Sequence, residues 1–286
     1  MTSVARVWGC RGSLPTPGER TVRYGGNTSC VEVCTGNGVP VILDAGTGIK
    51  RLGDSLDHPA RLHVLLTHLH LDHVEGLRFF EPLWREDAEV NIWGPPSPVH
   101  SLRDRIGRSF SPPLFPVDLA DIPAKVVFHD VPAEPFELEG MRVQAVPVSH
   151  PGATVGYRLE LDGGSLAFIP DHEPVLGVEL DTLSSDWISG HALADGVDVL
   201  VHDCQWSEDE YPERVGWGHS SVAHAVGFAR RAEVGRLVLF HHDPDRSDDE
   251  VDRMAARANE LWNGAGGVAP VAACEGMTID VGSSRD

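Results

Sequence analysis

The sequence is poor in basic side chains: its 286 residues include 23 Lys and Arg against 43 Asp and Glu, a formal net charge of −20. Long nucleic acids are bound chiefly by neutralising their phosphates with Lys and Arg. We therefore expect no long RNA or DNA partner. A small anionic substrate remains compatible with this charge, because bound divalent cations reverse the local potential inside a cleft.

Cysteine and long apolar runs are also scarce. The five cysteines are an odd number and include no Cys-x-x-Cys pair, so neither a disulfide framework nor a thiolate zinc site is expected. No apolar run approaches the about 20 residues that span a bilayer, and the opening MTSVARVWGCRGS lacks the apolar core of a secretory signal. The sequence therefore predicts a cytoplasmic protein with no membrane partner.

The rest of the composition is that of a globular protein, with 41% hydrophobic residues and enough length for a substantial core. No linker, repeat or low-complexity tract divides the chain, so we expect residues 1–286 to form a single α/β domain. Helical periodicity predicts helices at residues 76–86, 98–109, 221–232 and 248–262. Predicted strands include residues 30–35, 62–66, 141–147, 165–169, 197–202 and 236–240. This mixture indicates packed sheets with helices outside.

The stretch LLTHLHLDHVEG, residues 65–76, is the densest chemical signal. Three histidines and a carboxylate follow an apolar segment that we expect to be a buried strand ending near Thr67: His68, His70, Asp72 and His73. If the chain stays extended past the strand, alternate side chains point to one side, and the last histidine is reached by a turn. Imidazole nitrogen and carboxylate oxygen are ligands for Zn²⁺, Mn²⁺ and Fe²⁺. The stretch therefore predicts a metal site.

Four later segments also end an apolar strand in side chains that can bind metal. VQAVPVSHPG ends in His150, SLAFIPDHE in Asp171, DVLVHDCQW in His202 and Asp203, and RLVLFHHDP in His241 and His242. Strands fix such ligands at the rim of a sheet while the loops leave room for a substrate. One such residue could be a strand cap, but the recurrence predicts a shared site.

The order of these motifs resembles the metallo-β-lactamase fold superfamily. THLHLDH is similar to its HxHxDH signature, and His150, Asp171 and His241 follow in the order that the superfamily uses. The resemblance runs from GCRGS near the start to LFHHDP, which is most of the chain. It implies an αββα sandwich with a dinuclear metal centre.

The resemblance also implies how the ligands divide between two ions. One ion would be bound by His68, His70 and His150, the other by Asp72, His73 and His241, with Asp171 as the bridge. The choice of His241 over His242 follows from aligning RLVLFH with the family's strand-then-His motif. We expect two divalent cations, with zinc first and manganese or iron as alternatives.

Within the superfamily, the sequence is similar to the branch of ribonuclease Z and the cyclic-nucleotide phosphodiesterases. HPGATVGYRLE resembles that branch's His segment followed by Gly-Tyr-Arg, and VHDCQW with GWGHSS resembles its paired acidic and histidine motifs. By this match Asp203 would orient His219, which would contact the phosphoryl oxygen or protonate the leaving group. The alternative for His219 is a residue beside a helix cap at Ser220 or Ser221.

The branch implies a metal-dependent phosphodiesterase in which a metal-bound hydroxide attacks phosphorus, and Asp72 would also aim that hydroxide. Ribonuclease Z grips tRNA with a long Gly- and Lys-rich arm that we do not find, so small phosphodiesters such as cyclic nucleotides fit better. The alternatives are a lactonase, thioesterase or β-lactamase-type hydrolase on the same centre, a ribonuclease Z-like nuclease, and a sensor without turnover. Every ligand position is filled, which disfavours the sensor.

Four residues beside these motifs have two interpretations each. Trp206 and Trp217 could stack on a base or belong to the core. His172 and Glu173 stand where this branch often has a small polar residue, and they could support a ligand or narrow the choice of substrate.

The segment RSFSPPLFPVDLADIPA, residues 108–124, combines prolines that forbid a regular helix with apolar side chains too numerous for a solvated loop. We expect it to be covered, either as a lid on the active site or by a second subunit. The sequence predicts a homodimer whose apolar loop helps to shape the pocket.

Overall fold

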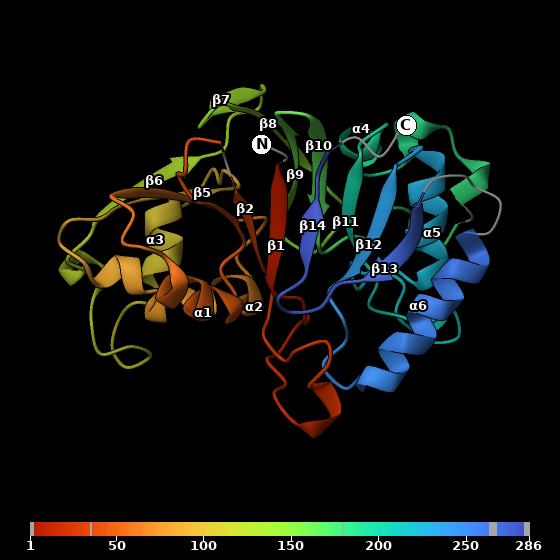
Figure 1. The fold of residues 1–286 in the computed structure, drawn as a ribbon, viewed down its shortest axis with the longest axis horizontal. Coiled ribbons are helices and arrows are strands. Elements are labelled where there is room, and N and C mark those ends of the chain that lie inside the picture. The colour runs from red at the N-terminus through yellow and green to blue at the C-terminus, as the bar shows by residue number, and fades with distance from the viewer. Residues whose placement is uncertain (1–2, 35, 179, 263–267, 283–286) are drawn as a thin grey trace.

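Figure 1 shows the computed structural model, which describes residues 3–34, 36–178, 180–262 and 268–282. Two seven-stranded sheets lie face to face, and helices cover their outer faces. This arrangement is the αββα sandwich that the resemblance implied. In the described part of the chain, no helix combines the length and apolarity that crossing a membrane requires.

The first sheet carries the N-terminal strands and one strand from the end of the chain. Its spatial order is β14 (Thr278–Asp280), β1 (Val4–Gly9), β2 (Cys30–Cys34), β3 (Val41–Leu43), β4 (Arg61–Leu65), β5 (Glu89–Gly94) and β6 (Lys125–Asp130). Residue 35, expected in β2, lies outside the described residues. Strands β3 to β6 pair in parallel. Helices α1 (Gly48–Ser55) and α3 (Leu102–Gly107) contribute to the core on the outer face of this sheet.

The second sheet has the order β13 (Val268–Ala272), β12 (Arg236–Phe240), β11 (Val199–Asp203), β10 (Gly164–Ile169), β9 (Val155–Leu161), β8 (Met141–Pro147) and β7 (Phe136–Leu138). Its outer face is covered by α4 (His191–Ala194), α5 (Val222–Arg231) and α6 (Asp248–Trp262). Strands β10, β11 and β12 are parallel, and β8 runs in the same direction because β8 and β10 are each antiparallel to β9. The C-terminal ends of these four strands therefore lie at the same edge of the sheet.

The layering follows from the two-residue period of the strands, as β10 illustrates. Leu166 and Phe168 belong to the core between the two sheets, whereas Ala167 and Ile169 belong to the core under the helices. All four side chains are fully buried. A strand that is covered on both faces needs a continuous apolar run, and SLAFI supplies one.

Two of the four predicted helices differ from the structure. Residues 76–86 form two short 3₁₀ helices, η2 (Glu75–Phe79) and η3 (Glu81–Trp84). One continuous helix cannot pass through Pro82, because proline lacks a backbone N–H and its ring clashes with the preceding turn. The helix expected at residues 98–109 shortens to α3, whose first turn is capped by the Ser101 hydroxyl accepting from the Asp104 backbone N–H. Helices α5 and α6 match their predicted ranges closely.

The proline-rich segment 108–124 lies against the helical layer of the first sheet. Phe110 is buried, and the Phe115 ring lies 5.7 Å from the Phe110 ring and 5.9 Å from the Phe79 ring, centroid to centroid. Leu114 stays 70% exposed. The two cavities beside the site described below are lined by other segments. The homodimer stays a prediction.

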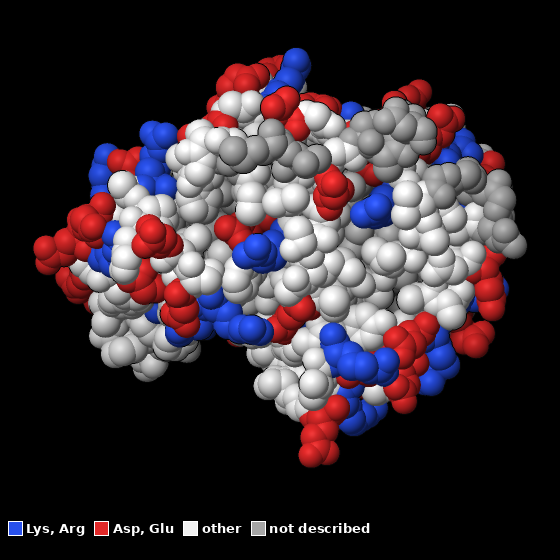
Figure 2. Space-filling model, in the orientation of Figure 1, with Lys and Arg blue, Asp and Glu red and all other residues white. Residues whose placement is uncertain are grey.

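Charged side chains are distributed without one dominant basic surface on the face shown in Figure 2. Lys and Arg side chains are scattered there among Asp and Glu. On this face, the distribution agrees with the excess of acidic residues in the sequence and offers no broad track for a polyanion.

Candidate metal centre

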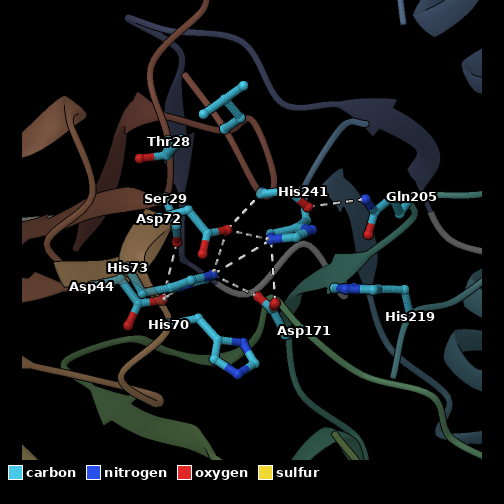
Figure 3. Close-up of polar contacts among 12 residues, drawn as sticks. Thr28, Ser29, Asp44, His70, Asp72, His73, Asp171, Gln205, His219 and His241 are labelled. Atoms are coloured by element: carbon cyan, nitrogen blue, oxygen red, sulfur yellow. Dashed lines mark hydrogen bonds and ion pairs between the residues drawn. The ribbon is translucent and has the colours of Figure 1, made fainter. Parts of the chain in front are cut away.

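The seven side chains expected as metal ligands converge at one edge of the sandwich, where the ends of strands from both sheets meet. Figure 3 shows His70, Asp72, His73, Asp171 and His241 in this region. Their donor atoms form two groups, and the atoms within each group lie within 4.8 Å of one another. We call His68, His70 and His150 the first group, and Asp72, His73, Asp171 and His241 the second group. These are the two sets that the resemblance implied, with Asp171 placed among the second.

The first group consists of imidazoles that face one another. His150 Nε2 lies 3.1 Å from His70 Nδ1, and His68 Nε2 is buried without a hydrogen-bond partner among the described residues. His150 is oriented by the Gly218 carbonyl oxygen, 2.8 Å from its Nδ1. Burial lowers the pKa of all three imidazoles, that of His68 well below its ordinary value. Neutral ring nitrogens that converge in this way fit a divalent cation.

The second group is fully buried and mixes imidazoles with carboxylates. His73 Nε2 lies 3.0 Å from Asp171 Oδ1, and His241 Nε2 lies 3.2 Å from Asp171 Oδ2 and 3.3 Å from Asp72 Oδ2. The two Nε2 atoms are 3.4 Å apart. Two carboxylates and two imidazoles aimed at one point also fit a divalent cation.

The carboxylates of the second group outweigh the effect of burial on the pKa values of its histidines. Burial alone lowers the pKa of an imidazole, but Asp171 and Asp72 outweigh it, so that the pKa of His73 is well above its ordinary value and that of His241 is about 9. Burial raises the pKa of the two carboxyls, yet the facing imidazoles outweigh it and hold both pKa values well below the ordinary range. A cation bound here would take the place of these imidazole protons.

Asp171 lies between the two groups. Its Oδ2 atom is 3.7 Å from His68 Nε2 and 3.7 Å from His150 Nε2, besides its contacts with the second group. Its side chain follows β10, in the centre of the second sheet. This is the position that a bridging carboxylate needs.

The structure distinguishes the two neighbouring histidines after β12. His241 points into the second group, whereas His242 Nε2 points away and donates to the Ala273 carbonyl oxygen at 2.9 Å. Burial lowers the pKa of His242 to about 3. His241 has a φ of 59°, a left-handed conformation that is costly for a non-glycine residue and typical of functional sites. This geometry favours His241 as the ligand.

The turn after His70 departs from the extended path that we expected. His70 itself is extended, but Leu71–Val74 form the short helix α2, so Asp72 does not alternate with His68 and His70. Backbone hydrogen bonds require this turn: Ala45 N–H donates to the His73 carbonyl oxygen, and Gly76 N–H donates to the Ala45 carbonyl oxygen. The turn carries Asp72 and His73 into the second group.

Asp44 supports the second group and was missed by the sequence reasoning. Its buried carboxylate lies 2.7 Å from His73 Nδ1 and accepts hydrogen bonds from Ser29 Oγ and from the backbone and hydroxyl of Thr67. Like His241, Asp44 follows a strand and has a φ of 59°. Hydrogen bonding of this kind fixes a ligand's tautomer and orientation. The signal was available, since VILDAG ends an apolar strand in a carboxylate.

Asp203 and His219 form the pair that the branch resemblance implied. Asp203 Oδ2 lies 2.6 Å from His219 Nδ1, and Asp203 Oδ1 accepts from the Ser220 backbone N–H at 2.9 Å. The His219 ring is stacked on His241 at 4.9 Å and meets His150 edge-on at 5.0 Å, centroid to centroid. His219 therefore stands beside both ligand groups. The helix cap of α5 is Ser221, whose hydroxyl accepts from the His224 backbone N–H, so the cap does not use His219.

Glu173 binds backbone N–H groups through its side chain, whereas His172 binds a carboxylate through its own backbone. The buried Glu173 carboxylate accepts hydrogen bonds from the backbone N–H groups of Gly216 and Gly218, at 2.9 Å each, and from the Tyr211 hydroxyl at 2.7 Å. It thereby holds the loop of residues 211–218, whose Gly218 carbonyl orients a first-group histidine. His172 donates its backbone N–H to Asp203 Oδ2 at 3.2 Å.

Glycine is required at position 218. Its φ of 85° is in the left-handed region, and a Cβ atom there would lie 2.5 Å from His150 Nδ1. The loop can therefore approach the first group closely only with glycine at this point.

Comparison with known proteins agrees with this geometry. Residues 41–242 match the family model described as "Beta-lactamase superfamily domain". The chain is 27% identical over 243 residues to ribonuclease Z of Mycobacterium bovis, covering 78% of this chain and 82% of that protein. It is 30% identical over 220 residues to an uncharacterized protein of Mycobacterium tuberculosis, covering 74% and 73% of the two chains.

Solved structures show the same fold. The metallo-β-lactamase fold protein YhfI from Bacillus subtilis superposes with a TM-score of 0.69 at 16% identity, over 98% of this chain and 99% of that one. A diphosphatase from the PhnP family gives a TM-score of 0.67 at 19% identity, over 97% of both chains. Since the family model spans well over half of the sequence, this chain belongs to the β-lactamase superfamily domain family, and it is a hydrolase of the metallo-β-lactamase fold with similarity to ribonuclease Z.

Proposed function

We propose that this protein is a metal-dependent phosphodiesterase that hydrolyses small phosphodiesters such as cyclic nucleotides. The two ligand groups would hold two divalent cations, and zinc is favoured because imidazole and carboxylate are its usual ligands at catalytic sites. Cations bound there would supply an activated water and neutralise charge on the phosphate. Similarity to a ribonuclease and to a diphosphatase supports chemistry on phosphate esters.

The observation that carries this proposal is the Asp203–His219 pair, 2.6 Å apart beside both ligand groups. An alkoxide leaves phosphorus poorly unless an acid protonates it, and the carboxylate behind His219 fixes the orientation and tautomer of its ring. The Nε2 of His219 is then the proton donor for the leaving oxygen. Hydrolysis of a thioester expels a thiolate, which leaves without such an acid.

The test compares leaving groups in the His219→Ala variant. For cyclic AMP, whose leaving group is a ribose alkoxide, we expect kcat to fall by about 10²–10⁴ because general-acid catalysis is lost. For bis(p-nitrophenyl) phosphate, whose leaving group needs no proton, we expect a much smaller fall. Metal content measured on the same samples separates this effect from lost ligands.

Two results would contradict the proposal. An equal loss of kcat for both phosphodiesters would remove the proton-donor role of His219. A wild-type protein that hydrolyses a lactone or thioester but neither phosphodiester would favour the other hydrolases of this fold.

A ribonuclease Z-like nuclease is the second candidate, because several relatives carry that name. The net charge of −20 argues against a long polyanionic substrate. Cleavage of a tRNA precursor at a higher kcat/KM than cyclic AMP would decide for the nuclease.

A further inference from the structure

A cavity of about 640 Å³ opens beside His219, and a separate cavity is lined by His68 and His70 of the first group. Its walls come from the loop of residues 211–218, from the segment after β11 and from the segment after β12. The candidate proton donor is therefore one wall of a space large enough for part of a substrate. What lines the rest of that space determines which substrate fits.

One wall is an aromatic platform made by Trp206, Arg214 and Trp217. The Arg214 guanidinium carbon lies 5.2 Å from the centre of the Trp206 ring and 4.9 Å from that of Trp217. The two indole rings are nearly perpendicular, at 84°. Trp206 is 7% exposed and Trp217 is 56% exposed. Trp206 thus belongs to the core, whereas Trp217 offers a free aromatic surface at the cavity.

This platform is held in place before any ligand arrives. Glu173 fixes the backbone of Gly216 and Gly218 on either side of Trp217, and the Trp217 backbone N–H donates to the Arg214 carbonyl oxygen at 3.0 Å. Binding to a preformed surface avoids the entropy cost of ordering a loop.

The remaining charged walls of the cavity are acidic. Glu210, Asp243 and Asp245 line it, against the single guanidinium of Arg214. Glu210 is partly neutralised by Arg246, 2.7 Å away. A second phosphate would meet more carboxylates than cations in this space. An aromatic group without its own negative charge fits better.

We propose that this cavity binds the base of a nucleoside cyclic monophosphate, with Trp217 stacking on the base and Arg214 supporting the stack from the other side of the indole. Bases stack well on indole rings, and stacking does not require a particular base sequence. This assignment rests on the proposed function, since it takes the phosphodiester to be bound next to His219. It makes Trp217 a specificity residue and predicts that cyclic AMP is a better substrate than cyclic di-AMP, which carries a second phosphate.

The kinetic test separates the base from the phosphodiester. In Trp217→Ala we expect KM for cyclic AMP to rise about tenfold, in line with the loss of one base–aromatic stack. KM for methyl riboside 3′,5′-cyclic phosphate, which has no base and no aromatic ring, should stay unchanged, and Trp217→Phe should recover most of the affinity for cyclic AMP. The matched control is Trp187→Ala, because Trp187 is 78% exposed and does not line the cavity.

A binding measurement makes the assignment independent of turnover. Calorimetric titration with AMP and with ribose 5-phosphate, which share a phosphate monoester, should show tighter binding of AMP to the wild type and loss of that preference in Trp217→Ala. A preference that survives in Trp217→Ala, or its absence in the wild type, would refute the base pocket. Failure of the wild type to cleave either phosphodiester would refute the proposed function instead, and faster cleavage of cyclic di-AMP would refute the preference for one phosphate.

Discussion

The two ligand groups differ in charge and in exposure, although they lie side by side. The first group consists of three imidazoles, one of which, His70, reaches the surface. The second group is completely buried and contains two carboxylates, whose charge raises the pKa of His241 to about 9. A cation in the first group would keep its full charge and an accessible face, whereas one in the second would be neutralised and enclosed. If both groups bind cations, we therefore expect the ion in the first group to be open to substrate and the ion in the second to be held more tightly.

Each group is also supported by a buried carboxylate outside it. Asp44 contacts the second-group residue His73 directly, at 2.7 Å. Glu173 reaches the first-group residue His150 only through the backbone, because it holds the loop whose Gly218 carbonyl orients that imidazole. Direct support should matter more than support through a loop. Substitutions at the centre, at Asp44 and at Glu173 should therefore have decreasing effects.

The largest effect is expected at Asp171, because its carboxylate contacts both groups. Asp171→Ala should lose both cations and reduce phosphodiester hydrolysis to background. His70→Ala, by comparison, should lose one cation and keep the other, since His70 belongs to the first group alone. Metal analysis by mass spectrometry after desalting measures both results. Equal metal loss in the two variants would show that the groups do not bind independently.

The side chains that converge at the sheet edge could be predicted from sequence because each signal is local. THLHLDH packs four candidate ligands into six positions, and the strand ending in FIPD marks Asp171 by the change from apolar to polar residues. The fold follows from the same strands, whose side chains point alternately into the core between the sheets and the core under the helices. The predicted extended path after His70 was wrong. There, backbone hydrogen bonds with Ala45, which lies just after β3, accompany a helical turn.

The supporting residues were harder to predict because their partners are distant in the chain. Glu173 is 43 residues from Gly216, and no spacing rule links a carboxylate to backbone N–H groups so far away. The same holds for the stack of Arg214 between two tryptophans, which depends on how the loop folds back. Asp44 carried a local signal, but one carboxylate after a strand is also a common turn residue. Only the tertiary structure shows that it faces His73.

An intermediate effect is expected for Asp44→Asn. The amide keeps the size of the side chain but removes the charge that orients His73, and loss of such support typically costs 10–100-fold in metal affinity or activity, so we expect about that range here. The loss should fall on the second group. Competition with a chelator measures this loss of affinity: one of the two cations should become easier to remove.

The control for Asp44→Asn is Ser29→Ala, which removes one hydrogen bond to the same carboxylate, of 3.0 Å, and leaves the contact with His73. It should change metal affinity far less. If both variants weaken metal binding equally, Asp44 serves the packing around it rather than the imidazole.

The smallest effect is expected for Glu173→Gln, because this residue acts through the loop of residues 211–218. The amide NH₂ would face backbone N–H donors of Gly216 and Gly218, so at least one charge-assisted hydrogen bond is lost, at a cost of about 1.5–3 kcal/mol in the free energy of unfolding. A loosened loop should raise KM for cyclic AMP several-fold while both cations stay bound. Tyr211→Phe is the matched variant, since it removes the hydroxyl bonds to Glu173 at 2.7 Å and to the Val175 carbonyl oxygen at 3.3 Å but leaves the bonds from Glu173 to the loop backbone. It should shift stability without shifting KM. If Glu173→Gln lowers stability but leaves KM unchanged, the carboxylate stabilises the fold and does not position the loop, and the support of the first group would then come from Gly218 alone.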